Sequence, residues 1–303
     1  MANLQEVRDR IGSVVTTQQI TKAMKLVAAS KLKRAQDRIT QMRPYSEKLY
    51  SILRNIMDGI EEGEIDLNLG QQREVKNVLI VLFTSDKGLC GGFNANLNKR
   101  ARALMNETYP DLLASGNVTL MTIGKKGKDF FKNYPTLNFN EDYINLFNNI
   151  SFEETAEAAE YVMNSFLDGT YDKVHVVFAE FKNAATQDFK QEQFLPIEQI
   201  ETEQEEDEKE KAKKVETDFI FEPEKVILIK ELIPKILKTQ FFRYLLDNNA
   251  SEHGARMVAM DQATENANEL LKSLKLQYNR ERQAAITKEI LEIVGGAAAL
   301  EEG

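Results

Sequence analysis

The stretch SDKGLCGGFN, residues 85–94, has the residue types that most suggest chemistry in this chain. It joins an apolar run to an amphipathic segment, and backbone N–H groups at a strand-to-helix junction favour anions. A nucleotide site is therefore one interpretation. The stretch contains neither a phosphate loop ending in Gly-Lys-Ser/Thr nor the dinucleotide pattern Gly-x-Gly-x-x-Gly. Its three glycines serve tight turning and close packing equally well, and we favour that structural role.

The two histidines and the single cysteine do not form a catalytic or metal-binding pattern. His175 falls in a predicted strand, His253 falls in a predicted long helix, and Cys90 is remote in sequence from both. A Cys–His nucleophile pair or a histidine metal site requires such groups to meet. We therefore expect structural histidines with satisfied hydrogen bonds, no catalytic residues, no metal and no cofactor.

The composition of the 303 residues narrows the class of protein. A net charge of −9 and a pI near 5.1 argue against a nucleic-acid partner. One cysteine fits a reducing compartment. The sequence has no apolar run of the roughly 20 residues that a membrane span needs, and its first residues lack the apolar core of a signal peptide. We expect a cytoplasmic protein that reaches a membrane only through a partner.

Residues 235–294 contain no proline and one glycine, which indicates a long helix. A helix of about 60 residues reaches roughly 90 Å, so we expect it to extend beyond a compact domain and to need a partner helix. Apolar or small residues recur in steps of three and four, the repeat of a coiled-coil seam: Met257, Met260, Thr264, Ala267, Leu271, Leu274 and Tyr278.

The same spacing recurs at the other end of the chain. The positions are Leu4, Val7, Ile11, Val14, Gln18, Thr21, Lys25, Ala28, Leu32, Ala35, Ile39 and Met42. Pro44 should make this helix bend or pause, and a helical pattern resumes to about residue 59. Two such seams predict an antiparallel coiled coil within one chain. Parallel dimers between chains would attach the central part at incompatible ends. We expect the last turns of the C-terminal helix to run past the N-terminal helix, and Gly295-Gly296 to break it.

The N-terminal helix also has an apolar, lysine-flanked outer side. Ile20, Met24 and Val27 lie off the seam, and five cations crowd around residues 26–30: Lys22, Lys25, Lys31, Lys33 and Arg34. A helix partly buried in its own domain is the simpler interpretation. Exposed apolar patches usually mark interaction sites, so on a long projecting helix we expect a partner surface with an acidic element.

The central sequence predicts a Rossmann-like parallel sheet. Strands are expected at residues 77–84, 118–123 and 173–181, with an edge strand at 187–197, and helices at 93–106, 125–134 and 152–167. The predicted division is residues 1–59 and 233–303 for the coiled coil and 60–232 for the α/β domain. Residues 201–216 are nearly all charged and predict a solvated insertion, with an acidic functional tail as the alternative.

Four blocks of the chain resemble the gamma subunit of the rotary, proton-translocating ATP synthase of bacterial type. They are ITKAMKLVAASK (20–31), SDKGLCGGFN (85–94), SEHGARMVAM (251–260), and YNRERQAAITKEI (278–290) ending in VGGAAAL (294–300). The charged insertion is the main departure, because it is longer than is typical of that family.

The resemblance implies a central rotor shaft that couples proton flow to ATP synthesis and hydrolysis on the beta subunits and regulates ATPase activity. It implies alpha, beta, epsilon and delta subunits and the membrane c-ring as partners, on the cytoplasmic face of a bacterial inner membrane. The absence of a transit peptide favours a bacterium over an organelle. The implied subunit-contact residues are Lys22, Met24, Lys25, Arg256, Arg282, Gln283 and Thr287.

Two other classes of protein remain possible at this point. One is an enzyme of the Rossmann-like domain whose helices serve only for oligomerisation. The other is a coiled-coil adaptor unrelated to ATP synthase.

Overall fold

The computed structural model describes residues 4–57, 69–197 and 225–301. The chain divides into two compact units, one of Met1–Ser30 with Arg256–Gly303 and one of Lys31–Ala255. Two long helices, α1 (Leu4–Met57) and α6 (Lys225–Glu301), belong in part to each unit. The predicted charged insertion at 201–216 lies outside the described residues.

The larger unit contains the predicted sheet. Its strands are β1 (Val78–Phe83), β2 (Val118–Ile123), β3 (Asn138–Asn140), β4 (Lys173–Phe181) and β5 (Gln187–Leu195), in the order β3-β2-β1-β4-β5. The pairs β1–β2, β1–β4 and β2–β3 are parallel, and β5 is an antiparallel edge strand. This confirms the predicted Rossmann-like sheet and its edge strand. The sequence analysis missed β3, whose three residues, NFN, are too short and polar to show strand periodicity.

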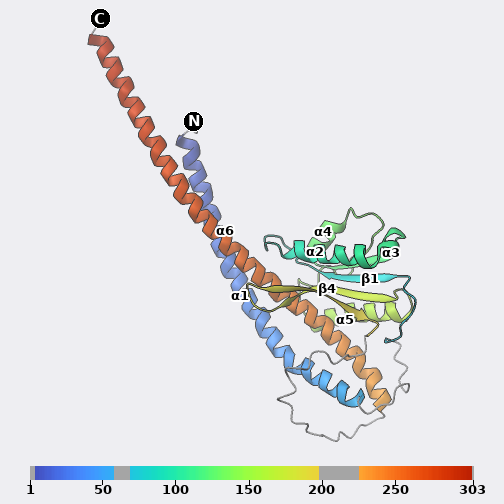
Figure 1. Ribbon diagram of the computed structural model, residues 1–303. Coiled ribbons are helices and arrows are strands. Elements are labelled where there is room, and N and C mark those ends of the chain that lie inside the picture. The colour runs from blue at the N-terminus through green and yellow to red at the C-terminus, as the bar shows by residue number, and fades with distance from the viewer. Residues whose placement is uncertain (1–3, 58–68, 198–224, 302–303) are drawn as a thin grey trace. The chain divides into compact units, whose positions relative to one another are not determined.

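Helices cover both faces of this sheet (Figure 1). One face packs α2 (Phe93–Ala103), the π-helical turn η1 (Leu104–Thr108), α3 (Pro110–Ala114) and α4 (Lys125–Phe131). The other packs α5 (Phe152–Leu167) and the part of α6 from Ile233 to Leu245. Successive residues of β1 alternate between the two clusters, because side chains of a strand point to opposite faces.

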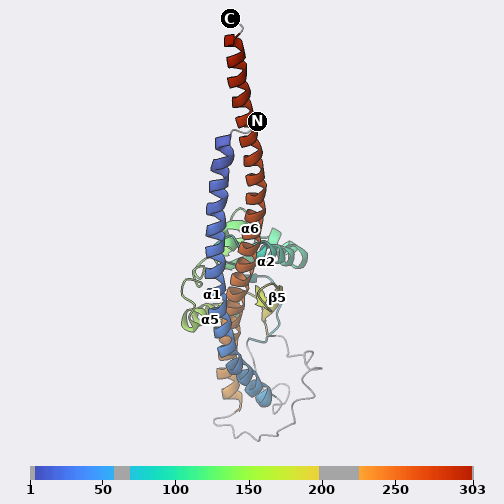
Figure 2. The ribbon, with the colours of Figure 1, turned by 90° about the vertical axis from the view of Figure 1, so that its left-hand side faces the viewer.

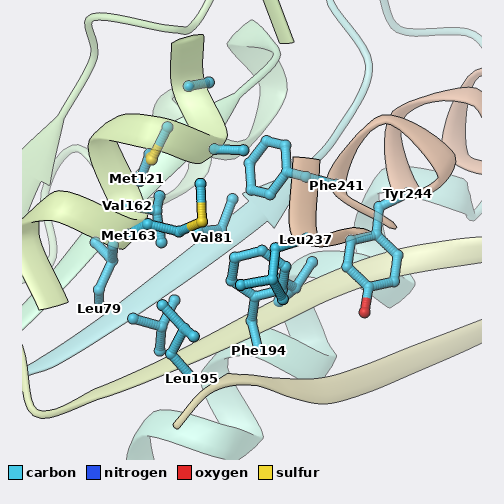
Figure 3. Packing of buried hydrophobic residues seen from close by; sticks show 14 of the residues in the cluster. Leu79, Val81, Met121, Val162, Met163, Phe194, Leu195, Leu237, Phe241 and Tyr244 are labelled. Atoms are coloured by element: carbon cyan, nitrogen blue, oxygen red, sulfur yellow. The ribbon is translucent and has the colours of Figure 1, made fainter. Parts of the chain in front are cut away.

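Aromatic residues of α6 join the core on the α5 side of the sheet. Figure 3 shows Phe241 and Tyr244 of α6 among side chains of the strands and of α5. The ring of Phe241 lies 5.4 Å from Phe83 and 5.7 Å from Phe194, and Tyr244 lies 4.3 Å from Phe178 (centroid distances). Burying such large rings is the main source of stabilisation where α6 meets the sheet.

The smaller unit is a pair of helices, with α1 and α6 side by side in both views (Figures 1 and 2). All nineteen predicted seam positions of the two helices are buried or half-buried. The seam repeat therefore predicted correctly which side of each helix is covered.

Three polar pairs between the helices show that the coiled coil is antiparallel. Lys25 Nζ lies 2.5 Å from Asp261 Oδ1, Thr264 Oγ1 donates to Thr21 Oγ1 at 2.8 Å, and Gln18 Nε2 donates to Asn268 Oδ1. The residue numbers fall on one helix as they rise on the other. These pairs account for the three polar positions of the N-terminal seam, because each has a polar partner across it.

Two local predictions about helix ends need correction. The expected break at Gly295-Gly296 is wrong, because α6 is helical through to Glu301. Each glycine costs a helix about 1 kcal/mol relative to alanine, and the alanines that follow favour helix most strongly. The start expected at residue 235 is also wrong, since α6 begins at Lys225 and includes Pro234. Burial of Ile233, Ile236 and Leu237 offsets the hydrogen bond that proline removes.

The predicted pause at Pro44 is wrong, because the helix α1 is continuous through Pro44 to Met57. The light blue stretch of α1 changes direction (Figure 1). A proline that lacks an N–H and crowds the preceding turn kinks a helix without ending it when the flanking turns are held.

His175 on β4 and Tyr109 before α3 form a buried pair within the larger unit. The Tyr109 hydroxyl lies 2.7 Å from His175 Nε2. Burial lowers the pKa of His175 to about 4, with a smaller contribution from Lys173, and burial raises the pKa of Tyr109 to about 12. Both groups are therefore neutral in the folded protein at pH 7, which confirms the prediction of a satisfied histidine.

This pair predicts a defined loss of stability in acid. His175 binds a proton near pH 6.5 when unfolded and only near pH 4 when folded. Its contribution is complete above pH 6.5 and is lost as the pH falls towards 4, by up to about 3 kcal/mol. The variant His175→Gln keeps a polar partner for Tyr109 and does not titrate. Urea unfolding at several pH values should show a steeper loss for the wild type over this window, and parallel curves would contradict the assignment.

Candidate subunit-contact surface

The glycine-rich loop at residues 85–94 is held by its own side chains. Asn94 Oδ1 accepts from the Ser85 N–H at 3.0 Å, and Asn94 Nδ2 donates to Ser85 Oγ at 2.7 Å. The same amide nitrogen lies 3.2 Å from the buried Cys90 Sγ. Polar groups that a nucleotide would need are thus engaged within the loop, which agrees with the structural role favoured from the sequence.

The loop also packs closely against the start of α4. Asp86 Oδ1 accepts from the Lys125 N–H at 3.2 Å, and Ser85 O accepts from the Lys126 N–H at 3.0 Å. Gly124, with φ of 98°, lies so near that a Cβ on it would be 2.3 Å from Thr84 O. The backbone N–H groups at the start of α4 are therefore used by the loop, and glycine is required for this approach.

The described residues offer little for catalysis. Among them, no group of three His, Cys, Asp or Glu side chains is placed to hold a metal ion. A cavity of about 520 Å³ lies beside α1, α5 and α6, and its lining is mostly apolar. It includes Arg38 and Tyr45 but no carboxylate, histidine or cysteine, so it lacks an acid–base pair.

The outer side of α1 in the smaller unit is the clearest interaction surface. Leu26, Val27 and Ile20 expose 65%, 57% and 54% of their surface, while Ala28 on the seam exposes 1%. Lys22 on the same turns is exposed as well. We call Ile20, Leu26, Val27 and Lys22 the apolar–basic band. Apolar side chains at this exposure beside a cation fit a partner that is apolar and acidic.

The predicted contact residues fall into two groups along the helices. Lys22 is exposed and Met24 is half-buried beside the band, and Lys25 pairs with Asp261. Arg256 is half-buried, five residues before Asp261 on α6. Arg282, Gln283 and Thr287 form the second group and are exposed.

The structure does not bring these two groups together. Gln283 lies 22 residues beyond Asp261 on the same helix, which is roughly 33 Å at the rise of an α-helix. Any coupling between Met24 and Gln283 or Thr287 therefore passes along the coiled coil or through another chain, since direct contact is excluded by this distance.

The second group belongs to an unpaired end of α6. Extending the register of the three polar pairs places Leu4 opposite about residue 282. Every residue from 282 to 297 is exposed, and the apolar side chains there include Ile286, Ile290, Ile293 and Val294. This confirms the expectation that the last turns of α6 run past the helix that pairs with it.

Sequence reasoning missed the residues that complete the polar pairs and those that fix α6 on the sheet. Asp261 and Asn268 lie beside the seam and could have been sought as partners for Lys25 and Gln18. Asn248 and Ser251 are fully buried polar residues within an apolar part of α6. The sequence could have indicated them, because they are two polar residues spaced by three within an apolar stretch that has to be buried.

The chain matches known proteins along almost its whole length. Residues 3–300 match the family model described as ATP synthase. The chain is 55% identical over 300 residues to the ATP synthase gamma chain of Cytophaga hutchinsonii, covering 99% of each chain. It is 45% identical over 302 residues to the ATP synthase gamma chain of Chlorobaculum tepidum, covering 100% of each.

Two solved structures share the fold. A chain of Euglena gracilis mitochondrial ATP synthase matches with a TM-score of 0.64 and 21% identity, covering 99% of this chain and 95% of that one. A chain from the central stalk and c-ring of Tetrahymena thermophila mitochondrial ATP synthase matches with a TM-score of 0.54 and 24% identity, covering 80% and 99%. None of the described helices has an apolar stretch long enough to cross a bilayer.

A full-length match at 55% identity excludes an adaptor unrelated to ATP synthase. Together with the family match over residues 3–300, it shows that this chain belongs to the ATP synthase gamma-chain family, the central stalk of the rotary enzyme.

Proposed function

We propose that the chain is the central rotor shaft of an ATP synthase, coupling proton flow through a membrane sector to ATP synthesis and hydrolysis and regulating ATPase activity. The observation that carries this proposal is the apolar–basic band on α1, which the chain's own α6 leaves uncovered. Membership of the gamma-chain family supplies the partner that fits it, an assembly of alpha and beta subunits.

In this proposal the chain has no catalytic residues of its own. Nucleotide chemistry takes place on the beta subunits, and this chain acts by contacting them differently in different orientations. A subunit shifts a neighbour's conformational equilibrium only through contacts that differ between the two states. The band is such a contact, because it occupies one side of the helix pair.

The contact residues proposed for this chain fall on two levels of the shaft. Lys22, Met24, Lys25 and Arg256 form the first level, and an acidic element of the beta subunit is the expected partner of the lysines. Arg282, Gln283 and Thr287 form the second level, on the unpaired end of α6. Two levels of contact resist tilting of a shaft better than one.

The remaining partners are proposed from the family. The chain would bind the epsilon subunit and the c-ring through its α/β domain, with the delta subunit elsewhere in the same complex. It would associate with the membrane only through that complex, on the cytoplasmic face of a bacterial inner membrane. The related solved structures include a central stalk with a c-ring and an ATP synthase rotor, which supports this assignment.

A charge placed in the band tests the contact. In Leu26→Glu, a side chain that is 65% exposed becomes negative, so the chain should fold normally. Opposite an apolar and acidic partner it should weaken assembly with alpha and beta subunits about tenfold, which corresponds to about 1.4 kcal/mol. Titration of labelled chain into alpha and beta subunits measures this.

The matched control is Leu167→Glu, the same change at a 44% exposed leucine that ends α5 outside the band. It should assemble as the wild type does. Equal weakening by both variants, or none by Leu26→Glu, would contradict the assignment of the band.

The exposed end of α6 predicts a large change in dynamics on assembly. An apolar helix end without a partner has little stability of its own. Amides of residues 286–294 should therefore exchange with deuterium quickly in the isolated chain and at least about tenfold more slowly in the complex. Residues 267–274, which lie on the paired seam, serve as the internal control and should be protected in both. Strong protection of residues 286–294 in the isolated chain would refute the prediction.

A further inference from the structure

The helix α6 is tied to the backbone of β4 by two buried side chains. The Ala179 N–H donates to Asn248 Oδ1 at 3.2 Å, and Ser251 Oγ donates to Ala179 O at 3.1 Å. Asn248 and Ser251 are both 0% exposed. They lie three residues apart and so share one face of the helix.

These two side chains form hydrogen bonds with Ala179 that a neighbouring strand would otherwise form. The register of β1 with β4 ends at the pair Leu82 and Val177, two residues before Ala179. Beyond that point, α6 supplies the acceptor for the Ala179 N–H and the donor for the Ala179 C=O. A backbone group that loses its partner in a buried site is strongly destabilised, so a turn of α6 about its own axis is opposed here.

Neighbouring contacts hold the same part of α6 to β4, β5 and the turn between them. The Tyr244 hydroxyl donates to Glu192 Oε2 at 2.8 Å, and Arg243 Nη2 lies 3.3 Å from Glu180 Oε1. At Gly254 a Cβ would be 3.0 Å from Ala184 O, so the helix backbone runs close against the β4–β5 turn. Apolar contacts such as those of Phe241 resist separation, but they are less directional than hydrogen bonds.

We propose that Asn248 and Ser251 are positioning residues for rotational coupling, because they fix the rotational setting of α6 on the sheet. The inference rests on the proposed function as a rotor shaft. α6 is one continuous helix from Lys225 to Glu301, so torque on the part that these residues anchor is carried along the same helix. Without the two hydrogen bonds, torque applied to the α/β domain would turn the sheet past the helix and be partly lost.

The test uses the whole complex, reconstituted in vesicles with its membrane sector. In Asn248→Leu with Ser251→Ala, both hydrogen bonds are lost and no exposed surface is altered. ATP hydrolysis should stay within about twofold of the wild type, while protons pumped per ATP hydrolysed should fall at least about threefold. The pH change across the vesicle membrane and the release of phosphate are measured on the same samples.

A matched control separates positioning from stability. Thr155 on α5 is also 0% exposed and lies in the same unit, but its Oγ1 donates at 2.7 Å to O of Ser151, the residue that caps α5, and not to β4. Thr155→Val should lower the urea midpoint of the chain and keep the wild-type pumping ratio. A wild-type ratio in the double variant, or an equal fall in Thr155→Val, would overturn the inference.

Two further outcomes are also decisive. If the double variant does not assemble, Ser251→Ala alone removes one oxygen atom and should lower the ratio in the same direction. An unchanged ratio in that single variant would then overturn the inference. A wild-type complex that does not pump protons would instead refute the proposed function, so the two failures are distinguishable.

Discussion

The structure depends on one constraint, which is that two helices from opposite ends of the chain cover each other along a narrow seam. The seam is built largely of small and medium residues, such as Ala28, Ala267 and Leu271, so the helices pack closely and leave their outer sides free. Gln18, Thr21 and Lys25 form polar pairs across the seam, and these pairs fix the antiparallel orientation and the register of the two helices. Lys25 and Asp261 are partly exposed and contribute little energy as an ion pair. Their value lies in specifying which residues face each other.

The antiparallel pairing explains why the sheet is inserted in the middle of the chain. In an antiparallel pair the end of one helix lies towards the beginning of the other, so a domain can join the end of α1 to the beginning of α6. That domain holds α6 by large buried rings, including Phe241 and Tyr244, and by polar contacts to β4. The two parts of α6 have different surroundings as a result. The part from Ile233 to Leu245 packs into the core, the middle part is covered on one side, and the last turns are exposed.

Much of this organisation could be predicted from the sequence because it depends on periodicity. Every seam position predicted from steps of three and four is buried or half-buried, and apolar runs located β1, β2 and β4 to within a residue. The helix ends were harder to predict. Proline and glycine disfavour helix, but burial or neighbouring alanines override this preference at Pro44, Pro234, Gly295 and Gly296. The short strand β3 has no periodicity to detect. The polar contacts of Asn248 with β4 depend on where two distant segments meet, which a single sequence does not encode locally.

The sequence predicted the two parts of the candidate surface, the band on α1 and the exposed end of α6, unequally well. The band around Leu26 stands out because apolar residues lie off the seam among lysines. The exposed end of α6 could be inferred only after the two helices were aligned antiparallel, since its residues resemble those of any amphipathic helix. The roles of Met24, Arg256, Gln283 and Thr287 came from family resemblance alone, and their separation along the coiled coil shows that they do not form one local site.

The central claim is that this chain turns inside an assembly of alpha and beta subunits. The direct measurement is single-molecule rotation, with the alpha and beta subunits fixed to a surface and a bead attached to a cysteine introduced at the exposed Leu167 on α5, in a background where Cys90 is replaced by serine. The account predicts that ATP drives the bead in one direction and that rotation stops when ATP is removed. A complex that hydrolyses ATP at its normal rate while the bead stays still, or moves equally in both directions, would contradict it.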